Sequence, residues 1–168
     1  LGVLADKGGN QVARADINAA GSIILGFAQT DTELSVNRDR GGEVAGDFIL
    51  VGDNNRIDLA SDSINATGNV SVVVNNLVGV QNLQAAGDLQ LVLRGADEFA
   101  AESLKGHYVG LVSQKGAFSI GSIESAQSVD LLRTDTEAAG SVVVSDIRAG
   151  DRVLVVNGSG GVELDHVL

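Results

Sequence analysis

A phrase of eleven residues recurs along this chain at intervals of roughly 20 residues, and it constrains the fold more than any other feature. The phrase reads INAAGSIILGF at 17–27, INATGNVSVVV at 64–74 and LQAAGDLQLVL at 83–93. Each copy has a glycine in its middle and alternating apolar residues after it. Internal repeats of this length are typical of solenoids, propellers and similar arrays.

Less complete copies extend the repeat over most of the chain. Gly46 in VAGDFILV matches the second half of the phrase, Gly106 in KGHYVGLV matches it loosely, and Gln127 takes the glycine position in IESAQSVDLL. The intervals between these positions vary from 19 to 25 residues. Two further copies follow at Gly140 and Gly150, where the interval shortens.

The alternation after each glycine predicts short β-strands. Val70, Val72 and Val74 would face one side of a strand, and Ser71 and Val73 would face the other. A period of two over five residues is typical of a strand, and β-branched residues are favoured there. The chain contains no proline, a residue that removes a backbone donor and interrupts a sheet.

A solenoid explains the constant spacing better than hairpins do. In a solenoid each residue lies on the equivalent residue of the preceding coil, so each position keeps its chemical type. Asparagine pairs at 54–55 and 75–76 repeat with the same period, which predicts an asparagine corner. We therefore expect an all-β fold: a single right-handed parallel β-helix (β-solenoid) over residues 1–168, with about eight coils of roughly 20 residues.

This fold makes definite predictions about burial. Leu89 and Leu91 should pack on Val70 and Val72 of the preceding coil, and Gln90 should face the solvent. Because the aromatic residues are only four Phe and one Tyr, the core should be aliphatic and layered. The segment ADEFAAESLKG (96–106) has a helical composition and a glycine stop, but we expect strands there as well.

Charge and composition restrict the partners. A net charge of −11 repels phosphate backbones, so we expect no nucleic-acid partner. No cysteine is present, which excludes a disulfide framework. No apolar run approaches the ~18 residues that span a bilayer, so we expect no membrane insertion. The chain begins with Leu1 and contains no methionine, and we interpret it as a fragment of a longer or processed protein.

The phrases AAGDLQLVL, ATGNVSVVV, AAGSVVVSDI and RAGDRVLVV resemble the haemagglutinin-type repeats of filamentous haemagglutinin and related two-partner secretion exoproteins. The resemblance covers residues 17–156, although the intervals are looser than an ideal array and the family's amino-terminal secretion domain is not visible. It implies a shaft segment of a secreted adhesin at the bacterial cell surface, a virulence-type cell-adhesion protein. It further implies export through an outer-membrane β-barrel partner and attachment to host cells or other bacteria through an unidentified ligand.

Two other functions compete with this non-enzymatic interpretation. A β-helical polysaccharide lyase or hydrolase would line a groove with aromatic residues and with basic or paired acidic residues, and this chain offers few aromatics. The stalk of a contact-dependent toxin delivery protein has the same repeats, and its toxin would lie outside this segment. The fold alone does not separate these functions.

Several polar motifs raise the question of metal binding or catalysis. The motif TDTE occurs at Thr30–Glu33 and at Thr134–Glu137, where a carboxylate pair could bind calcium or act as acid and base. Alternating threonine and acid is more typical of an exposed turn. The segment GDNNRID (52–58) lacks the spacing and final glutamate of an EF-hand loop, and we interpret it as a corner.

The segment NGSGGVELD (157–165) is similar to the glycine-rich calcium nonapeptide of secreted β-rolls. That motif needs tandem copies because each ion is shared between turns, and only one imperfect copy is present. We therefore expect folding without calcium.

The two histidines, His107 and His166, have no cluster of metal ligands around them in the sequence. A Ser–His–Asp arrangement stays open, because serines and aspartates are plentiful and no nucleophile elbow singles one out. The Asn-x-Ser/Thr triplets at Asn65, Asn69 and Asn157 fit glycosylation, but turn-forming asparagine explains them more simply. We assign no catalytic, cofactor-binding or metal-binding residue, and no cofactor.

Overall fold

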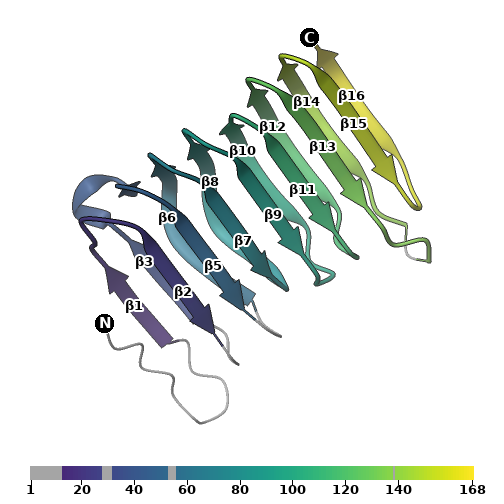
Figure 1. Cartoon of the computed structure of the whole chain (residues 1–168). Coiled ribbons are helices and arrows are strands. Elements are labelled where there is room, and N and C mark those ends of the chain that lie inside the picture. Colours follow the sequence, from purple (N-terminus) through teal and green to yellow (C-terminus); the bar gives the residue numbers. More distant parts are fainter. Residues whose placement is uncertain (1–12, 28–31, 53–55, 138) are drawn as a thin grey trace.

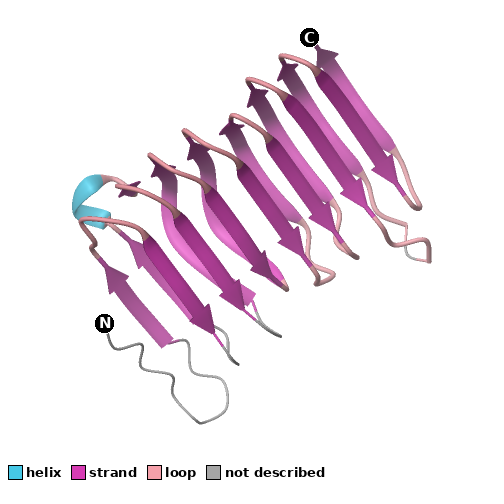
Figure 2. Cartoon of the chain, viewed as in Figure 1, coloured by secondary structure: helices cyan, strands magenta, loops and turns pink. Residues whose placement is uncertain are grey.

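The computed structural model describes residues 13–27, 32–52, 56–137 and 139–168, which wind as a parallel β-solenoid (Figure 1). The strands form two sheets that run along the length of the rod, and every pairing is parallel (Figure 2). Each coil contributes to both sheets, and the coil that contains β3 and β4 contributes two strands to sheet A. The described residues therefore form seven complete coils, and the last strand begins an eighth.

Sheet A contains β1 (Ala13–Ile17), β3 (Thr32–Val36), β4 (Glu43–Val44), β6 (Arg56–Ala66), β8 (Asn76–Ala85), β10 (Phe99–Gly106), β12 (Phe118–Ser125), β14 (Val142–Ala149) and β16 (Val162–Val167). Sheet B contains β2 (Ile23–Phe27), β5 (Phe48–Gly52), β7 (Val70–Val74), β9 (Leu89–Leu93), β11 (Val109–Ser113), β13 (Ser128–Arg133) and β15 (Arg152–Asn157). One turn of 3₁₀ helix, η1 (Arg38–Arg40), precedes β4. No helix in the described part of the chain has the length and apolar character needed to cross a membrane.

The core consists mainly of aliphatic side chains stacked from coil to coil, with Phe48, Phe99 and Phe118 buried among them. Leu89 pairs with Val70 and Leu91 with Val72, and all four side chains are buried, which confirms the predicted stack. Gln90 between them is exposed, also as predicted. The same two inward columns continue through sheet B from Ile23 and Leu25 to Val129 and Leu131. The segment 96–106 contains β10, so the expectation of strands there is confirmed.

The long strands of sheet A contain a bend that the simple alternation did not predict. In β12, Ile120 and Ile123 both face the core, although three positions separate them. The intervening Gly121 pairs with no residue of β10 or β14, whereas its neighbours pair on both sides. One extra residue at the bend shifts the phase of the alternation, and each coil thereby turns within sheet A.

The register corrects the assignment of three repeat positions. The column of Gly68 and Gly87 continues through His107, Gln127 and Asp151, each of whose amides donates to the carbonyl of the residue below. Gly106 and Gly150 therefore each lie one residue before the position that belongs to this column.

Gly140 lies at a different corner, because the valines after it belong to sheet A: Val142 pairs with Phe118. The shortened interval before Gly150 is thus not a short coil. Coils remain 19 to 25 residues apart throughout the described residues, which agrees with the loose period seen in the sequence.

Candidate functional site

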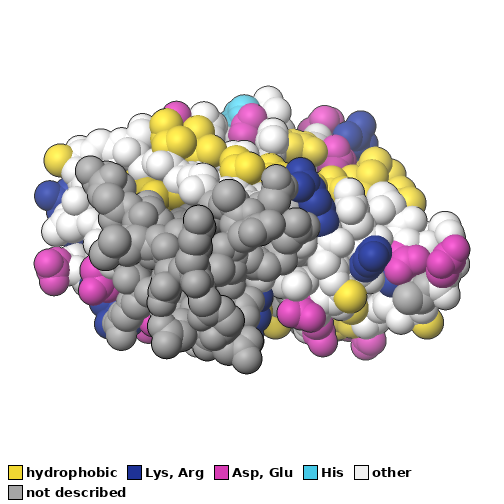
Figure 3. All heavy atoms as spheres, turned by 90° about the horizontal axis from the view of Figure 1, so that it is seen from below, with side chains coloured by type: hydrophobic (Ala, Val, Ile, Leu, Met, Phe, Trp, Pro, Cys, Tyr) yellow, Lys and Arg dark blue, Asp and Glu magenta, His cyan; other side chains and the backbone are white. Residues whose placement is uncertain are grey.

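The outer faces of the two sheets differ in chemistry. Two outward columns of sheet A are polar: one is formed by the half-buried Asn82, Ser103, Ser122 and Asp146, and the other by the exposed Gln84, Lys105, Glu124 and Arg148. Sheet B carries an outward apolar column, formed by Val51, Val73, Val92, Val112, Leu132 and Val156. Val51 and Val156 are 45% and 44% exposed. Figure 3 shows that surface hydrophobic side chains are grouped rather than evenly spread.

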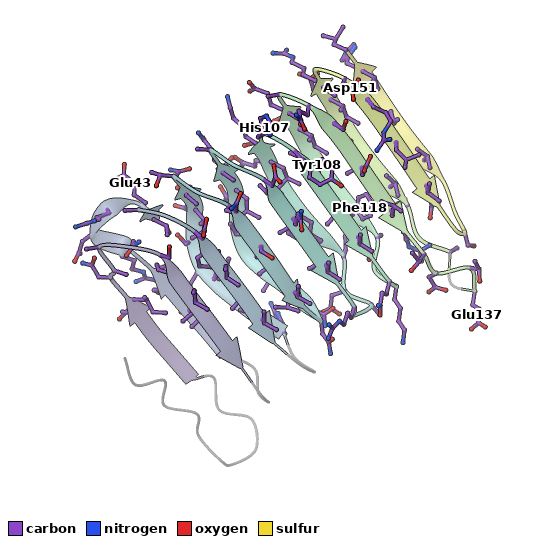
Figure 4. All side chains as sticks on the ribbon, in the orientation of Figure 1. Glu43, His107, Tyr108, Phe118, Glu137 and Asp151 are labelled. Atoms are coloured by element: carbon purple, nitrogen blue, oxygen red, sulfur yellow. The ribbon has the colours of Figure 1, made fainter. Side chains whose placement is uncertain are left out.

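Beside this apolar column, the single tyrosine of the chain lies flat on sheet B. Tyr108 immediately precedes β11, and its ring covers Gly110 on the same strand: a Cβ at Gly110 would come within 2.9 Å of the ring's Cε1 atom and hydroxyl oxygen. Gly110 is consequently buried although it points outward. Figure 4 shows Tyr108 on the ribbon between the neighbouring coils.

The Tyr108 ring is held in place by two charged residues of the next coils. Its hydroxyl donates a hydrogen bond to Asp130 Oδ2 at 3.0 Å, and Arg152 Nη2 donates to both carboxylate oxygens of Asp130 at 2.9 and 3.1 Å. Partial burial of the hydroxyl and its hydrogen bond to Asp130 raise the pKa of Tyr108 above the usual 10.0. At neutral pH the group is therefore a protonated donor.

His107 lies next to Tyr108 at the corner and pairs with an acid of the preceding coil, with Nδ1 3.6 Å from Asp88 Oδ1. The hydroxyl of Ser125 binds the backbone carbonyl of His107 at 2.9 Å. Within the described residues, no serine hydroxyl is bonded to the His107 imidazole, so the structure does not assemble the Ser–His–Asp arrangement left open above. His166 pairs in register with Asp146 at an exposed position of β16.

A hollow of about 270 Å³ lies at this corner, beside His107, Lys105, Glu124 and Ser125. Lys105 Nζ and Glu124 Oε1 form an ion pair at 2.9 Å, and Ser125 Oγ is engaged with backbone carbonyls. Lys105, Glu124 and Ser125 are thus occupied by interactions within the protein and do not converge on the centre of the hollow.

The second TDTE motif forms a turn around a buried arginine. Arg133, 1% exposed, occupies an inward position of β13. Its guanidinium donates to the carbonyls of Lys115 at 2.9 Å and Ser159 at 2.7 Å, and lies 3.7 Å from Asp135 Oδ2. Asp135 Oδ1 also accepts the Glu137 amide at 2.8 Å. The carboxylate of Asp135 therefore stabilises the turn through the Glu137 amide and the Arg133 guanidinium. Of the first TDTE motif, residues 30 and 31 lie outside the described residues, and Thr32 and Glu33 begin β3.

Asn157, the first residue of NGSGGVELD, faces the same interior. Its side-chain oxygen accepts from Arg133 at 3.2 Å, and its amide nitrogen donates to the carbonyls of Gly140 and Gly161 at 2.9 Å each. Because both hydrogen bonds use the amide nitrogen to which a glycan would be attached, they argue against the hypothesis that Asn157 is glycosylated. No group of three or more His, Cys, Asp or Glu side chains suited to a metal ion occurs within the ranges that the structure describes.

The asparagines of the other two Asn-x-Ser/Thr triplets lie at a corner, in the case of Asn69, and in a strand, in the case of Asn65. Asn69 binds the main chain of the next coil, with Oδ1 accepting from the Asp88 amide at 2.9 Å. Asn65 lies in the paired part of β6. The centre of GDNNRID and the Asn54–Asn55 pair lie outside the described residues.

Sequence reasoning missed Tyr108, the outer apolar column and Arg133. The alternation Val129, Leu131, Arg133 was available as a signal, because the same period that buries the two aliphatic residues also points the arginine inward. Comparison of the chain with protein-family models, curated proteins and solved structures finds no significant match.

Proposed function

We propose that this chain is a rigid, non-enzymatic shaft segment of a large secreted adhesin of the filamentous haemagglutinin type. The observation that carries the proposal is the uninterrupted stacking of buried apolar columns through sheet B. Seven coils at a strand spacing of about 4.8 Å span roughly 34 Å. A rod of this kind can be extended by further coils without changing its cross-section.

The proposal includes export through an outer-membrane β-barrel partner, display at the bacterial surface, and attachment to host cells or other bacteria. Its support is the resemblance of the repeat phrases together with the solenoid fold. An antibody raised against the chain should label intact bacteria that carry the parent protein. Labelling only after the cells are permeabilised would contradict display at the surface.

The adhesive part of the proposal is tested with coated beads. Beads that carry the folded chain should attach to cultured epithelial cells or to bacteria in greater numbers than albumin-coated beads. Beads coated with Leu89→Asp, in which the middle coils are expected to open, are the matched control for surface chemistry. Equal attachment of folded chain and albumin would leave a shaft without an adhesive role.

The non-enzymatic part is tested with polysaccharides. Incubation with a panel of neutral and acidic polysaccharides should release no new reducing ends and no unsaturated products. Reproducible turnover of any one polymer would replace the shaft by a lyase or hydrolase.

A further inference from the structure

The outward side of the Tyr108 ring offers a flat apolar platform on a surface that is otherwise polar at this corner. The ring's inner side covers Gly110, so it lies along the sheet instead of projecting from it. Its hydroxyl is bound to Asp130, which Arg152 holds through two hydrogen bonds. The platform is thereby fixed before any ligand arrives, which lowers the entropy cost of binding.

Exposed polar side chains that can form hydrogen bonds with a ligand surround the ring on neighbouring coils. The register places Gln90, Gly110 and Asp130 in one outward column, so Gln90 and Asp130 flank the glycine that the ring covers. Gln90 is exposed, and the side chains of Asp88 and Arg152 are 46% and 60% exposed. The rim therefore presents a carboxylate acceptor, a guanidinium donor and an amide that does both.

We propose that Tyr108 is the stacking platform of a binding site for a neutral saccharide, with Gln90, Asp88 and Arg152 at its hydrogen-bonding rim. A sugar ring has an apolar C–H face that can pack on an aromatic ring, and hydroxyls at its edge that both donate and accept. Asp88 at the rim, Asp130 behind the ring hydroxyl and the net charge of −11 disfavour an acidic sugar.

The inference rests on the proposed adhesive role for its biological purpose, since it names the ligand class that the shaft would contact. Binding by the isolated chain is nevertheless a separate measurement from bead attachment. A chain that binds sugar but does not attach to cells would contradict the adhesin alone, and the reverse result would contradict the site alone.

The chain provides its own probe, because it has one tyrosine and no tryptophan. Titration with lactose, cellobiose and maltose should change tyrosine fluorescence saturably for at least one sugar, with a Kd on the order of 1 mM, a range expected for one small shallow site. Glucuronic acid should bind at least several-fold more weakly than the best neutral sugar.

Variants locate the site by calorimetry. Tyr108→Ala should abolish binding, whereas Tyr108→Phe, which keeps the ring, should retain it within a few-fold. Gln90→Ala should weaken binding several-fold, and Gln84→Ala, an exposed glutamine on sheet A, should leave it unchanged. The proposal is overturned by the absence of saturable binding, by full binding in Tyr108→Ala, or by loss of binding in a folded Tyr108→Phe.

Discussion

Gly87 lies directly against the side-chain oxygen of Asn69 in the coil below. A Cβ atom at Gly87 would come within 2.3 Å of Asn69 Oδ1, and that oxygen accepts the Asp88 amide at 2.9 Å. Gly68 has the same relationship to Asp47, whose Oδ1 lies 2.3 Å from the position of a Cβ. At Gly68 and Gly87 the glycine thus makes room for a polar side chain that binds the next coil.

Gly87→Ala should lower the free energy of unfolding by about 1–2 kcal/mol, because the methyl group displaces Asn69 from the Asp88 amide. In an Asn69→Ala background the same change should cost markedly less, since the displaced oxygen is gone. A double-mutant cycle in urea measures this coupling. Gly21→Ala, whose Cβ would meet no atom within 4 Å, is the control and should stay within about 0.5 kcal/mol of wild type. Additive effects of the two substitutions would contradict this account of the glycine.

Leu89→Asp should destabilise the rod by several kcal/mol, because it buries an unpaired carboxylate in the aliphatic column. Gln90→Asp, one residue along and exposed, should cost well under about 1 kcal/mol. Since each coil contacts mainly its neighbours, limited proteolysis should cut the first variant between residues 70 and 106 and spare the second. Equal sensitivity of the two variants would be inconsistent with the observed alternation.

Arg133→Met should lower stability by about 3 kcal/mol or more, because the carbonyls of Lys115 and Ser159 lose a buried donor. Arg148→Met is the matched control: Arg148 is 63% exposed and pairs with Asp146 on the surface, so its loss should cost less than about 1 kcal/mol. Urea midpoints at a constant slope measure both changes. Similar midpoints for the two variants would show that Arg133 does not hold the turn at 134–137.

Tyrosinate absorbance should titrate above pH 10 in the folded chain, because burial and the bond to Asp130 raise the pKa of Tyr108. Asp130→Asn should move this titration down towards the ordinary value. A pKa raised on folding stabilises the native state below the unfolded pKa, and that contribution is lost as the pH rises through the folded pKa. The free energy of unfolding should therefore fall less between neutral and alkaline pH in Asp130→Asn than in the wild type. An unchanged titration would show that the carboxylate does not act on the ring.

Chelation of calcium should leave the melting temperature unchanged within a few degrees. The reason is that Asp135 pairs with Arg133 and Asn157 binds protein carbonyls, so both are already bound within the protein. A fall of more than about 10 °C in EDTA, equivalent to roughly 2 kcal/mol or more, would reveal a calcium site. Refolding in EDTA provides a second, independent readout.

The sequence predicted the solenoid and its inner columns because stacking forces equivalent residues to share one environment, as Val70 and Leu89 do. It did not predict the bend in sheet A, where one extra residue between Ile120 and Ile123 resets the alternation. Nor did it place Gly106 correctly, because the register is set by pairing along whole strands and not by one residue type.

The candidate site was harder to predict than the fold. Tyr108 acquires its role only through Gly110 beneath it and Asp130 one coil later, and the latter contact crosses 22 residues of sequence. A turn motif such as TDTE, by contrast, is visible locally, but its chemistry depended on an arginine whose burial only the packing reveals.

The corner side chains that bind the next coil also determine how the rod would respond to tension. Hydrogen bonds between coils lie along the rod axis, so a pulling force loads them directly and opens the rod coil by coil. At the first three junctions, the side chains of Ser22, Asp47 and Asn69 accept hydrogen bonds from the backbone amides of Asp47, Asn69 and Asp88. At the next three junctions, the positions equivalent to Gly68 and Gly87 are occupied by His107, Gln127 and Asp151. These residues bind the preceding coil through their backbone amides. The carboxyl-terminal coils are joined by side chains at other positions, where Tyr108 and Arg152 bind Asp130 and Arg133 binds the carbonyls of Lys115 and Ser159. Under load, the side-chain reinforcement should therefore shift from this corner in the amino-terminal coils to the outer face of sheet B and the buried arginine in the carboxyl-terminal ones.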